Sequence, residues 1–475
     1  MAFAELHRTL DPEPVTTLDD HVGAGGGRGL AVVSDAGGDA VLAVLEASGL
    51  RGRGGAGFPT ATKWRTVLGQ RAGPPPTVVV NGAEGEPGSF KDRMILRRNP
   101  YRVIEGALVA ARVAGADEVV VALKASSTVE RARVRAAMDE ITAAGWADGV
   151  ALRVAEGPTA YLFGEETALL EVLDGRPPFP RVAPPWRRGV DDVGDRPDEA
   201  AGSHLGGVDS PTDVPPALVN NVETMANVAL IAAEGADWFR SAGTASSPGT
   251  IVVTVSGDVE RSGVVEVAMG TPLREVIEAV GFPTERRRIL AVLSGVSAPV
   301  LPASALDTPL THEDLRAAGS GLGATGYIVV DDSRDMAAVA AGVSRFLAIE
   351  SCGQCMPCKA DGLEVAGRLE AIIGGRADTT ALPVIVERLD GIEYGARCSL
   401  ASQHRAVVGS LLDAFPGVVE GHLDRRLEPV EPFPVAEIVD LTDDGVAVLD
   451  DRQLRKQPDW TYGDTWTGAF PAALA

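Results

Sequence analysis

The pattern of apolar and polar positions changes along the chain. In the first half of the chain, short continuous apolar runs alternate with stretches of helical periodicity. Short continuous apolar runs, Thr77–Val80 and Val119–Leu123, flank a helical stretch at Val103–Ala114. Continuous apolar runs are typical of strands buried on both faces of a parallel sheet, and the helix between them supplies the crossover. This half therefore predicts an α/β unit, with further elements expected as a strand over 150–154 and helices over 41–47 and 167–173.

After about residue 245 the pattern becomes that of a smaller unit with strands around one short helix. A Gly257-Asp258 turn between two apolar runs predicts a hairpin. Thr271 followed by Pro272 predicts a helix N-cap with proline at the first helical position. Two strands, a helix and two more strands indicate a small β-grasp-like domain, with strands over 251–256, 264–268, 289–293 and 327–330 and a helix over 273–280.

The third segment is helical and carries every cysteine. Apolar positions at helical spacing predict helices over 336–349, 362–373, 382–389 and 403–415. The sequence thus predicts a multidomain α/β plus α protein. Its expected parts are an α/β domain at 1–245 with an irregular insertion at about 187–216, a β-grasp domain at 246–333, a helical domain at 334–425 and a C-terminal arm at 426–475.

Length and charge fit this division and exclude some functions. A chain of 475 residues suggests about three domains. The formal net charge of -23 makes nucleic acid or an anionic membrane surface a poor partner. The sequence has no run of 18 apolar residues, and residues 1–8 lack the order of a signal peptide. We therefore expect a cytoplasmic protein with no membrane span of its own, which partners could attach to a membrane complex.

The four cysteines form one constellation. Cys352, Cys355 and Cys358 follow one another at spacings of three, and Cys398 lies on a later segment. Separated pairs are more usual in structural zinc sites, whereas three close thiols and a distant fourth fit a [4Fe–4S] cluster. We interpret the set as the ligands of one [4Fe–4S] cluster; structural zinc and free thiols are the alternatives.

A glycine-rich loop precedes the first strand. Residues Gly52–Gly57 match G-x-G-x-x-G, but a helix and not a strand leads into them, which argues against an ordinary dinucleotide fingerprint. Exposed backbone N–H groups and a positive charge such as that of Lys63 could still bind a phosphate. A plain surface loop is the alternative.

An acidic segment follows the first strand. Glu84 and Glu86 lie among glycines just after Thr77–Val80, at the carboxyl end of the strand, where open α/β sheets bind ligands. These carboxylates could orient polar groups of a substrate, or they could be solvated loop acids.

Taken together, the motifs identify a family. The chain resembles the FMN-containing flavoprotein subunit of the NADH dehydrogenase module of respiratory complex I and the related diaphorase subunits of hydrogenases and formate dehydrogenases. The resemblance covers about residues 45–415 and rests on five motifs in the family's order: 49–64, 81–93, 161–168, 220–227 and the cysteine set.

The resemblance implies that 1–245 is a Rossmann-like α/β flavin domain that binds FMN and that 334–425 is a helical bundle with one [4Fe–4S] cluster. It also implies NAD(H) as substrate, with roles carried over to individual residues. The residues expected around FMN are Gly52, Gly54, Lys63, Asn81, Glu84, Gly164, Asn220, Asn221 and Thr224. Phe58 is expected to stack on the nicotinamide nucleotide. Glu86 and Glu166 are the expected catalytic carboxylates of the nucleotide site, and Trp186 stands near it where the family has phenylalanine. A bound flavin would receive two electrons as hydride and release them singly to the cluster.

Several departures from the family pattern fall on the nucleotide side. Ala83 replaces an aspartate, Gly85 replaces a serine and Ala183 replaces a basic residue. A relay that exchanges electrons with a ferredoxin-like protein and no longer binds NAD(H) is therefore the main alternative to an NAD(P)H dehydrogenase, and a zinc-bound scaffold is a lesser one.

The four cysteines suffice for one cluster only, so electrons need a partner. The resemblance suggests a thioredoxin-like [2Fe–2S] subunit in a larger oxidoreductase complex; a ferredoxin-like carrier is the alternative. The sequence does not indicate the final acceptor or the direction of electron flow.

Overall fold

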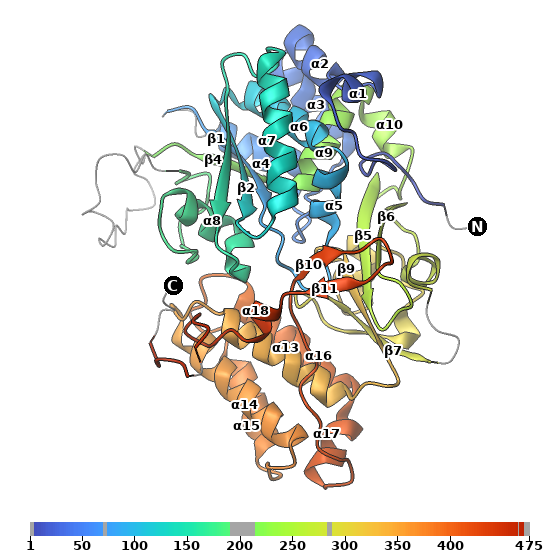
Figure 1. Ribbon diagram of the computed structural model, residues 1–475, viewed down its shortest axis with the longest axis vertical. Coiled ribbons are helices and arrows are strands. Elements are labelled where there is room, and N and C mark those ends of the chain that lie inside the picture. Colours follow the sequence, from blue (N-terminus) through green and yellow to red (C-terminus); the bar gives the residue numbers. More distant parts are fainter. Residues whose placement is uncertain (1–3, 70–73, 191–213, 283–286, 464, 470–475) are drawn as a thin grey trace. The chain divides into compact units, whose positions relative to one another are not determined.

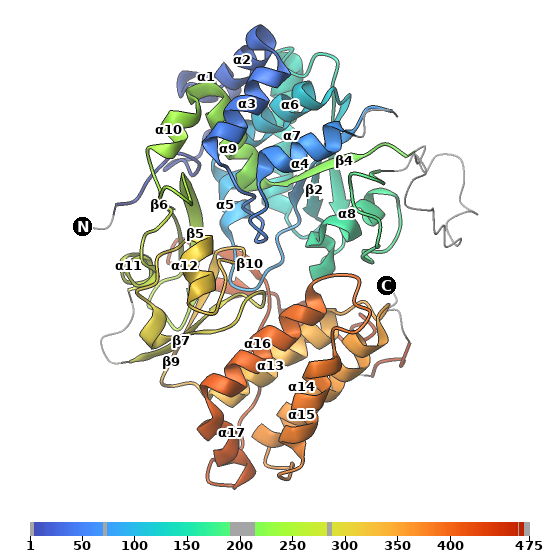
Figure 2. The same cartoon turned by 180° about the vertical axis from the view of Figure 1, so that it is seen from behind.

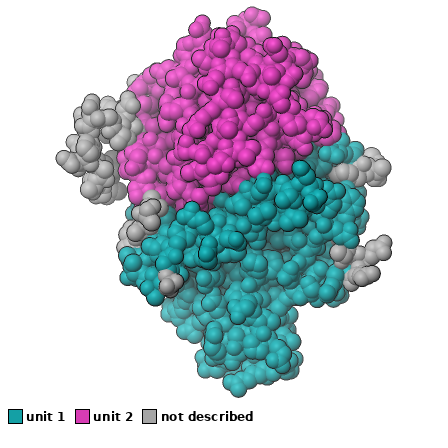
Figure 3. Space-filling model, in the orientation of Figure 1, with its two compact units in different colours: residues 1–5, 85–91, 252–475 teal, residues 6–84, 92–251 magenta. Residues whose placement is uncertain are grey.

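The computed structural model describes residues 4–69, 74–190, 214–282, 287–463 and 465–469 (Figure 1). Most of the insertion expected at about 187–216 lies outside the described residues. Contacts divide the chain into two compact units: unit 2 comprises residues 6–84 and 92–251, and unit 1 comprises residues 1–5, 85–91 and 252–475 (Figure 3).

Unit 2 is built on a four-stranded parallel sheet, as the apolar runs predicted. The strand order is β3-β2-β1-β4, with β1 at Thr77–Gly82, β2 at Glu118–Lys124, β3 at Ala151–Gly157 and β4 at Ala217–Asn221. Val79 pairs with Val120 on one side and with Val219 on the other. The carboxyl ends of β1 and β4 therefore lie side by side.

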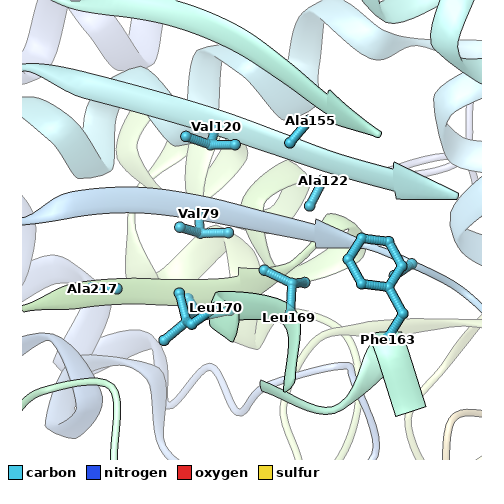
Figure 4. Packing of buried hydrophobic residues seen from close by; sticks show 10 residues of the cluster. Val79, Val120, Ala122, Ala155, Phe163, Leu169, Leu170 and Ala217 are labelled. Carbon is cyan, nitrogen blue, oxygen red and sulfur yellow. The ribbon is translucent and has the colours of Figure 1, made fainter. Parts of the chain in front are cut away.

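Helices cover both faces of this sheet, which explains why its strands are apolar throughout. Helices α6 (Pro100–Ala114), α7 (Thr128–Ala143) and α9 (Val222–Glu234) pack against the strands. Against the other face pack the 3-10 turn η1 (Tyr161–Gly164) and α8 (Glu166–Leu173), whose Phe163, Leu169 and Leu170 meet Val79 and Val120 (Figure 4).

Helix α6 begins at a strong signal and approaches α9 closely. Asn99 is its N-cap, with a side chain that accepts a hydrogen bond from Arg102 N, and Pro100 occupies the first turn. A Cβ on Gly106 would lie 1.9 Å from the carbonyl oxygen of Met225, so this crossing requires glycine. The remaining helices of unit 2 are α1 (Leu18–Gly23), α2 (Arg28–Ala36), α3 (Gly38–Ser48), α4 (Thr60–Leu68), α5 (Lys91–Arg98, whose first residue groups with unit 1) and α10 (Ala236–Arg240).

Unit 1 contains a five-stranded mixed sheet in the order β6-β5-β9-β7-β8. Its strands are β5 (Thr250–Gly257, beginning at the unit boundary), β6 (Gly263–Ala268), β7 (Ile289–Ser294), β8 (Leu301–Pro302) and β9 (Gly326–Asp331). Strand β9 pairs in parallel with β5 and antiparallel with β7. The four longer strands confirm the predicted ones, and β8 and helix α12 (His312–Ala317) were not predicted.

Strands β5 and β6 are hydrogen-bonded neighbours joined by residues 258–262, as the predicted hairpin requires. One local prediction in this sheet was wrong. Helix α11 (Leu273–Val276) begins after Pro272, and the Thr271 hydroxyl donates to Ala268 O and does not cap the helix. The helix continues as η3 (Ile277–Gly281).

The second half of unit 1 is helical, and its four predicted helices are confirmed. They are α13 (Met336–Glu350), α14 (Gly362–Ile373), α15 (Ala381–Gly391) and α16 (Leu400–Ala414), with α13 packed on α14 and α16 (Figure 2). The other elements are η4 (Ala303–Ala305), η5 (Pro357–Asp361), α17 (Pro416–Leu423), the antiparallel pair β10 (Ile438–Leu441) and β11 (Ala447–Leu449), and α18 (Asp451–Leu454). Within the described ranges, every helix is too short or too polar to cross a membrane.

Candidate functional site

The glycine-rich loop of unit 2 joins α3 to α4 and is closed by its own backbone. Gly52 N donates to Phe58 O at 2.9 Å, and Thr60 N donates to Leu50 O at 3.0 Å. Gly57 has a φ of 63°, a left-handed conformation that favours glycine. The loop follows a helix, as expected, and ends at the N-terminus of α4, which no side chain caps.

Gly54 and Thr224 connect this loop to the end of β4. A Cβ on Gly54 would lie 3.3 Å from the Cβ of Asn221, so glycine permits a close approach here. Arg53 N donates to the Thr224 hydroxyl at 2.9 Å. The Arg53 side chain is buried and donates to Thr250 O at 3.0 Å, so it supports the loop from within and does not extend a charge into solvent.

Two side chains of helix α4 form hydrogen bonds with residues of β4. The Lys63 ammonium forms an ion pair with Glu166 and donates to Val219 O at 2.9 Å. The indole nitrogen of Trp64 donates to Asn220 Oδ1 at 3.0 Å. The lysine side chain is 21% exposed, so its charge can reach a ligand at this edge.

The end of β1 is fixed by the segment that precedes α8. Asn81 Nδ2 donates to Gly164 O at 2.8 Å, and Asn81 Oδ1 accepts from Ala83 N at 3.1 Å. A Cβ on Gly164 would lie 2.9 Å from Ala83 O, so the two segments are in close contact. The Asn81–Arg93 and Tyr161–Ala168 motifs thus meet at one edge of the sheet.

Glu84 has a local contact that sequence reasoning missed. Its carboxylate accepts Asp92 N at 3.2 Å and Arg93 N at 3.1 Å, which stabilises the N-terminus of α5. Asn221 Nδ2 donates to Asp92 Oδ2 at 2.6 Å, so the start of α5 is also connected to the end of β4.

Glu165 is a second residue that the sequence prediction missed. Its carboxylate accepts Thr167 N at 3.0 Å and Ala168 N at 2.8 Å, which makes it the N-cap of α8 and orients the neighbouring Glu166. Burial raises the pKa of Glu165. Glutamate is an uncommon N-cap residue, so the local pattern carried little signal for this role.

The expected nucleotide residues are divided between the units. Phe58 is 52% exposed in the glycine loop, and Trp186 is partly buried; both belong to unit 2. Glu86 belongs to unit 1, where its carboxylate accepts Val296 N at 2.7 Å. The α/β unit therefore brings together the expected flavin residues and Glu166, but not Glu86.

The four cysteines belong to the helical half of unit 1. Cys352 and Cys358 are buried, whereas Cys355 and Cys398 are partly exposed. The first three lie between α13 and α14, and Cys398 lies just before α16. Gln354 Oε1 accepts from Arg397 Nη1 at 2.8 Å, which connects the two cysteine segments.

Polar groups lie against the thiols. Ser351 Oγ and Cys358 Sγ are 3.3 Å apart, and Gln354 Nε2 donates to Cys352 Sγ at 3.5 Å. Burial raises the pKa of the Cys358 thiol to about 11. Burial lowers the pKa of the neighbouring Lys359 to about 8, although the Glu350 carboxylate opposes this shift.

These donors fit an iron–sulfur cluster. Four thiolates are the usual ligands of a [4Fe–4S] cluster, and hydrogen bonds to sulfur and a nearby cation are the protein's means of tuning it. Among the described residues, no three His, Cys, Asp or Glu side chains are grouped to hold one metal ion. A cubane requires a different arrangement, because each of its four thiolates binds a separate iron.

The residues at the edge of the α/β sheet also fit the predicted flavin nucleotide. The Thr60 hydroxyl is buried at the start of α4 without a hydrogen-bond partner among the residues that the structure describes, and the neighbouring Lys63 supplies a cation. A glycine loop, an uncapped helix N-terminus and a cation form a suitable site for a phosphate group.

Comparisons with known families agree with both sites. Residues 45–230 match the Nuo51 FMN-binding domain, residues 252–300 match the SLBB domain, and residues 338–422 match the NADH-ubiquinone oxidoreductase-F iron-sulfur binding region. The first match contains the glycine loop and the edge of the sheet, and the last contains all four cysteines.

Individual relatives extend the likeness to most of the chain. The NADH-quinone oxidoreductase F-subunit 2 of Rhizobium meliloti (strain 1021) is 35% identical over 440 residues, which cover 89% of this chain and 98% of the relative. The corresponding F-subunit of Rickettsia bellii (strain OSU 85-389) is 35% identical over 395 residues, which cover 81% and 90%.

A solved structure gives the same result for the fold. A chain of an NAD+-reducing [NiFe]-hydrogenase in the H2-reduced state has a TM-score of 0.72 and 35% identity over 81% of this chain. This chain spans 62% of that hydrogenase chain.

The fold and the two sites define an oxidoreductase subunit that combines an FMN-binding α/β unit with a [4Fe–4S]-binding helical region. More specifically, the chain belongs to the family of NADH-quinone oxidoreductase F-subunits.

Proposed function

We propose that this protein oxidises NADH in a larger electron-transfer complex and passes the electrons singly to a partner subunit. The observation that carries the proposal is the convergence of Lys63, Asn81, Glu166 and Asn220 at one edge of the parallel sheet. FMN, when bound, supplies the conversion from hydride transfer to single-electron transfer.

In this proposal, unit 2 binds and orients the flavin nucleotide. Backbone N–H groups of the glycine loop other than those of Gly52 and Arg53, which donate to Phe58 O and the Thr224 hydroxyl, bind the phosphate together with the Lys63 ammonium. Asn81, Gly164, Asn220, Asn221 and Thr224 surround the ring system, and Glu84 acts indirectly by anchoring α5. Gly52 belongs to this loop, and a Cβ there would make only an ordinary van der Waals contact, 3.6 Å from Phe58 O.

Glu166 couples flavin binding to the nucleotide site. Its carboxylate pairs with Lys63 in the structure. A phosphate at Lys63 would compete for that ammonium and free the carboxylate to accept hydrogen bonds from a dinucleotide. Phe58, being exposed, supplies a ring on which a base can stack. For Glu86 and Trp186 the proposed role in nucleotide binding rests on the family resemblance.

The cluster site follows from the same family assignment. Cys352, Cys355, Cys358 and Cys398 would hold one [4Fe–4S] cluster, which supplies a one-electron relay. A thioredoxin-like [2Fe–2S] subunit is the proposed acceptor, and the protein would be a peripheral subunit of its complex.

We also propose the β-grasp assignment for 246–333, which the mixed five-stranded sheet supports, and the separate flavin (1–245), helical (334–425) and arm (426–475) segments.

The experiment is a cofactor and reduction analysis of the protein purified without oxygen. One FMN and four irons per chain are expected, and NADH should bleach the flavin absorption. A colourless, zinc-containing preparation would contradict the cofactor assignment. Reduction by a ferredoxin with no response to NADH or NADPH would contradict the assignment of NADH as the electron donor.

A further inference from the structure

The described part of the C-terminal arm, residues 426–463 and 465–469, lies beyond the three family matches, the last of which ends at residue 422. It contains β10, β11 and α18. Gln453, Lys456 and Trp460 of this arm are each at most 6% exposed. The arm, which belongs to unit 1, is therefore packed against the rest of that unit.

Its buried side chains contact the last turn of α13. Lys456 Nζ lies 2.8 Å from Glu350 Oε2, and Gln453 Nε2 donates to Glu350 Oε1 at 3.0 Å. The indole nitrogen of Trp460 donates to Ile349 O at 2.7 Å, and the Lys456 ammonium lies 4.5 Å from the centre of the Trp460 ring. Both partners of the ion pair are buried, so the pair is shielded from solvent.

Lys359 holds the same turn of α13 through other contacts. Its ammonium donates to Ala348 O at 2.9 Å, Ile349 O at 3.1 Å and Ser351 O at 2.9 Å. The final carbonyls of a helix have no partner within the helix, so these bonds fix the position at which α13 ends. Cys352 follows directly after Ser351, and Cys358 precedes Lys359.

We propose that the C-terminal arm positions the cysteine loop: Lys456 and Trp460 fix the end of α13, and the Glu350–Lys456 pair adjusts the electrostatic field at the cluster. The inference rests on the proposed cluster site. Lys456, Gln453 and Trp460 act here as positioning residues, since their contacts reach the cysteines through Ile349 and Glu350.

The charges near the cysteines determine the direction in which each variant should shift the reduction potential of the cluster. Glu350 lies two residues before Cys352 and pairs with Lys456 at 2.8 Å, and Lys359 directly follows Cys358 and donates to Ser351 O at 2.9 Å, so these charges lie beside the cysteine loop. Reduction adds a negative charge to the cluster, which a nearby cation favours and a nearby carboxylate opposes. Glu350→Gln should therefore raise the reduction potential, and Lys456→Met should lower it.

The test uses the complete chain, purified with its cofactors under anaerobic conditions. Two quantities are measured: the rate of iron loss to a chelator, and the cluster's midpoint potential from an EPR-monitored titration. Lys456→Met and Trp460→Phe should each lose iron about tenfold faster, the size typical of outer-sphere changes at metal sites. Trp460→Phe keeps every charge, so its potential should move less than that of Lys456→Met.

Arg455→Met is the matched control, because Arg455 is the exposed neighbour of Lys456 and its loss removes the same charge. Arg455→Met should leave the rate of iron loss and the midpoint potential unchanged. FMN content should stay constant in every variant.

Wild-type iron retention and potential in Lys456→Met, Trp460→Phe and Glu350→Gln would overturn the inference. Loss of FMN together with iron would also overturn it, because the effect would then be global and not local. If the purified wild-type protein contained no iron, that result would instead contradict the proposed cluster site itself.

Discussion

Trp64 and Asn220 join the flavin loop to the sheet: the indole nitrogen of Trp64 lies 3.0 Å from Asn220 Oδ1, and Trp64 is 1% exposed. Trp64→Phe would keep an aromatic ring but leave the buried amide oxygen without this donor. We expect a loss of about 1–3 kcal/mol in the free energy of unfolding of the flavin unit, together with weaker FMN binding. Chemical denaturation with and without added FMN measures both; unchanged FMN affinity would show that this bond does not shape the flavin site.

Lys63 is expected to bind the FMN phosphate. Lys63→Met should weaken FMN binding by about tenfold or more, because a charge-assisted hydrogen bond contributes about 1.5–3 kcal/mol. Fluorescence titration of the deflavinated protein with FMN measures the change. Arg65→Met is the control, since Arg65 lies on the same helix and its exposed side chain pairs with Glu46. Equal losses of FMN affinity in Lys63→Met and Arg65→Met would show that the overall charge of the protein, and not a contact of Lys63 with the phosphate, determines FMN binding.

The Glu166 carboxylate pairs with Lys63, but its proposed role is to accept hydrogen bonds from NADH and not to bind FMN. Glu166→Gln should retain FMN and slow reduction by NADH, because the amide cannot accept the same hydrogen bonds as a carboxylate. Anaerobic single-turnover absorption measures this rate. Loss of FMN in this variant, with normal NADH reduction of the flavin that remains, would assign Glu166 to the flavin site.

Cys355 lies in unit 1, whereas the proposed flavin residues lie in unit 2. Cys355→Ser should therefore remove the cluster and its EPR signal while FMN stays bound at the wild-type stoichiometry. Iron and flavin analysis of the purified variant checks this result. Simultaneous loss of flavin would contradict the separation of the two sites.

His404 gives a stability effect that depends on pH. Burial lowers the pKa of His404 to about 3, whereas an exposed histidine has a pKa near 6.5. The unfolded state therefore binds a proton that the folded state does not, and stability falls as pH drops below about 6.5, by up to about 1.4 kcal/mol per pH unit.

The matched variant is His404→Gln, which can still hydrogen-bond the Ser344 hydroxyl, 2.8 Å from Nε2 in the wild type. Its free energy of unfolding should depend less steeply on pH between about 6.5 and 5 in urea denaturation. Parallel curves for wild type and variant would show that folding does not lower the pKa of His404.

The sequence predicted the main elements because their apolar patterns are long and regular. The runs that became β1, β2 and β9, and the helical stretch of α14, are buried in the structure as the pattern required. The predicted cap at Thr271 was wrong, because contacts outside the helix decide how such a short segment begins: Thr271 N–H and hydroxyl donate to Ala268 O.

Side-chain contacts between distant segments could not be predicted. The cysteine spacing and the glycine loop were visible in the sequence, but the pairing of Glu84 with the start of α5 and of Lys456 with Glu350 depends on the folded backbone. Neither the Glu165 cap nor the buried lysine of the arm has a sequence signature.

The most direct test of the proposed function is an anaerobic titration of the purified protein with NADH, followed by flavin absorption and by EPR of the cluster. We predict that NADH bleaches the flavin and that the signal of a reduced [4Fe–4S] cluster appears with it. A protein that contains FMN and iron but shows neither change with NADH or NADPH would contradict the proposed function.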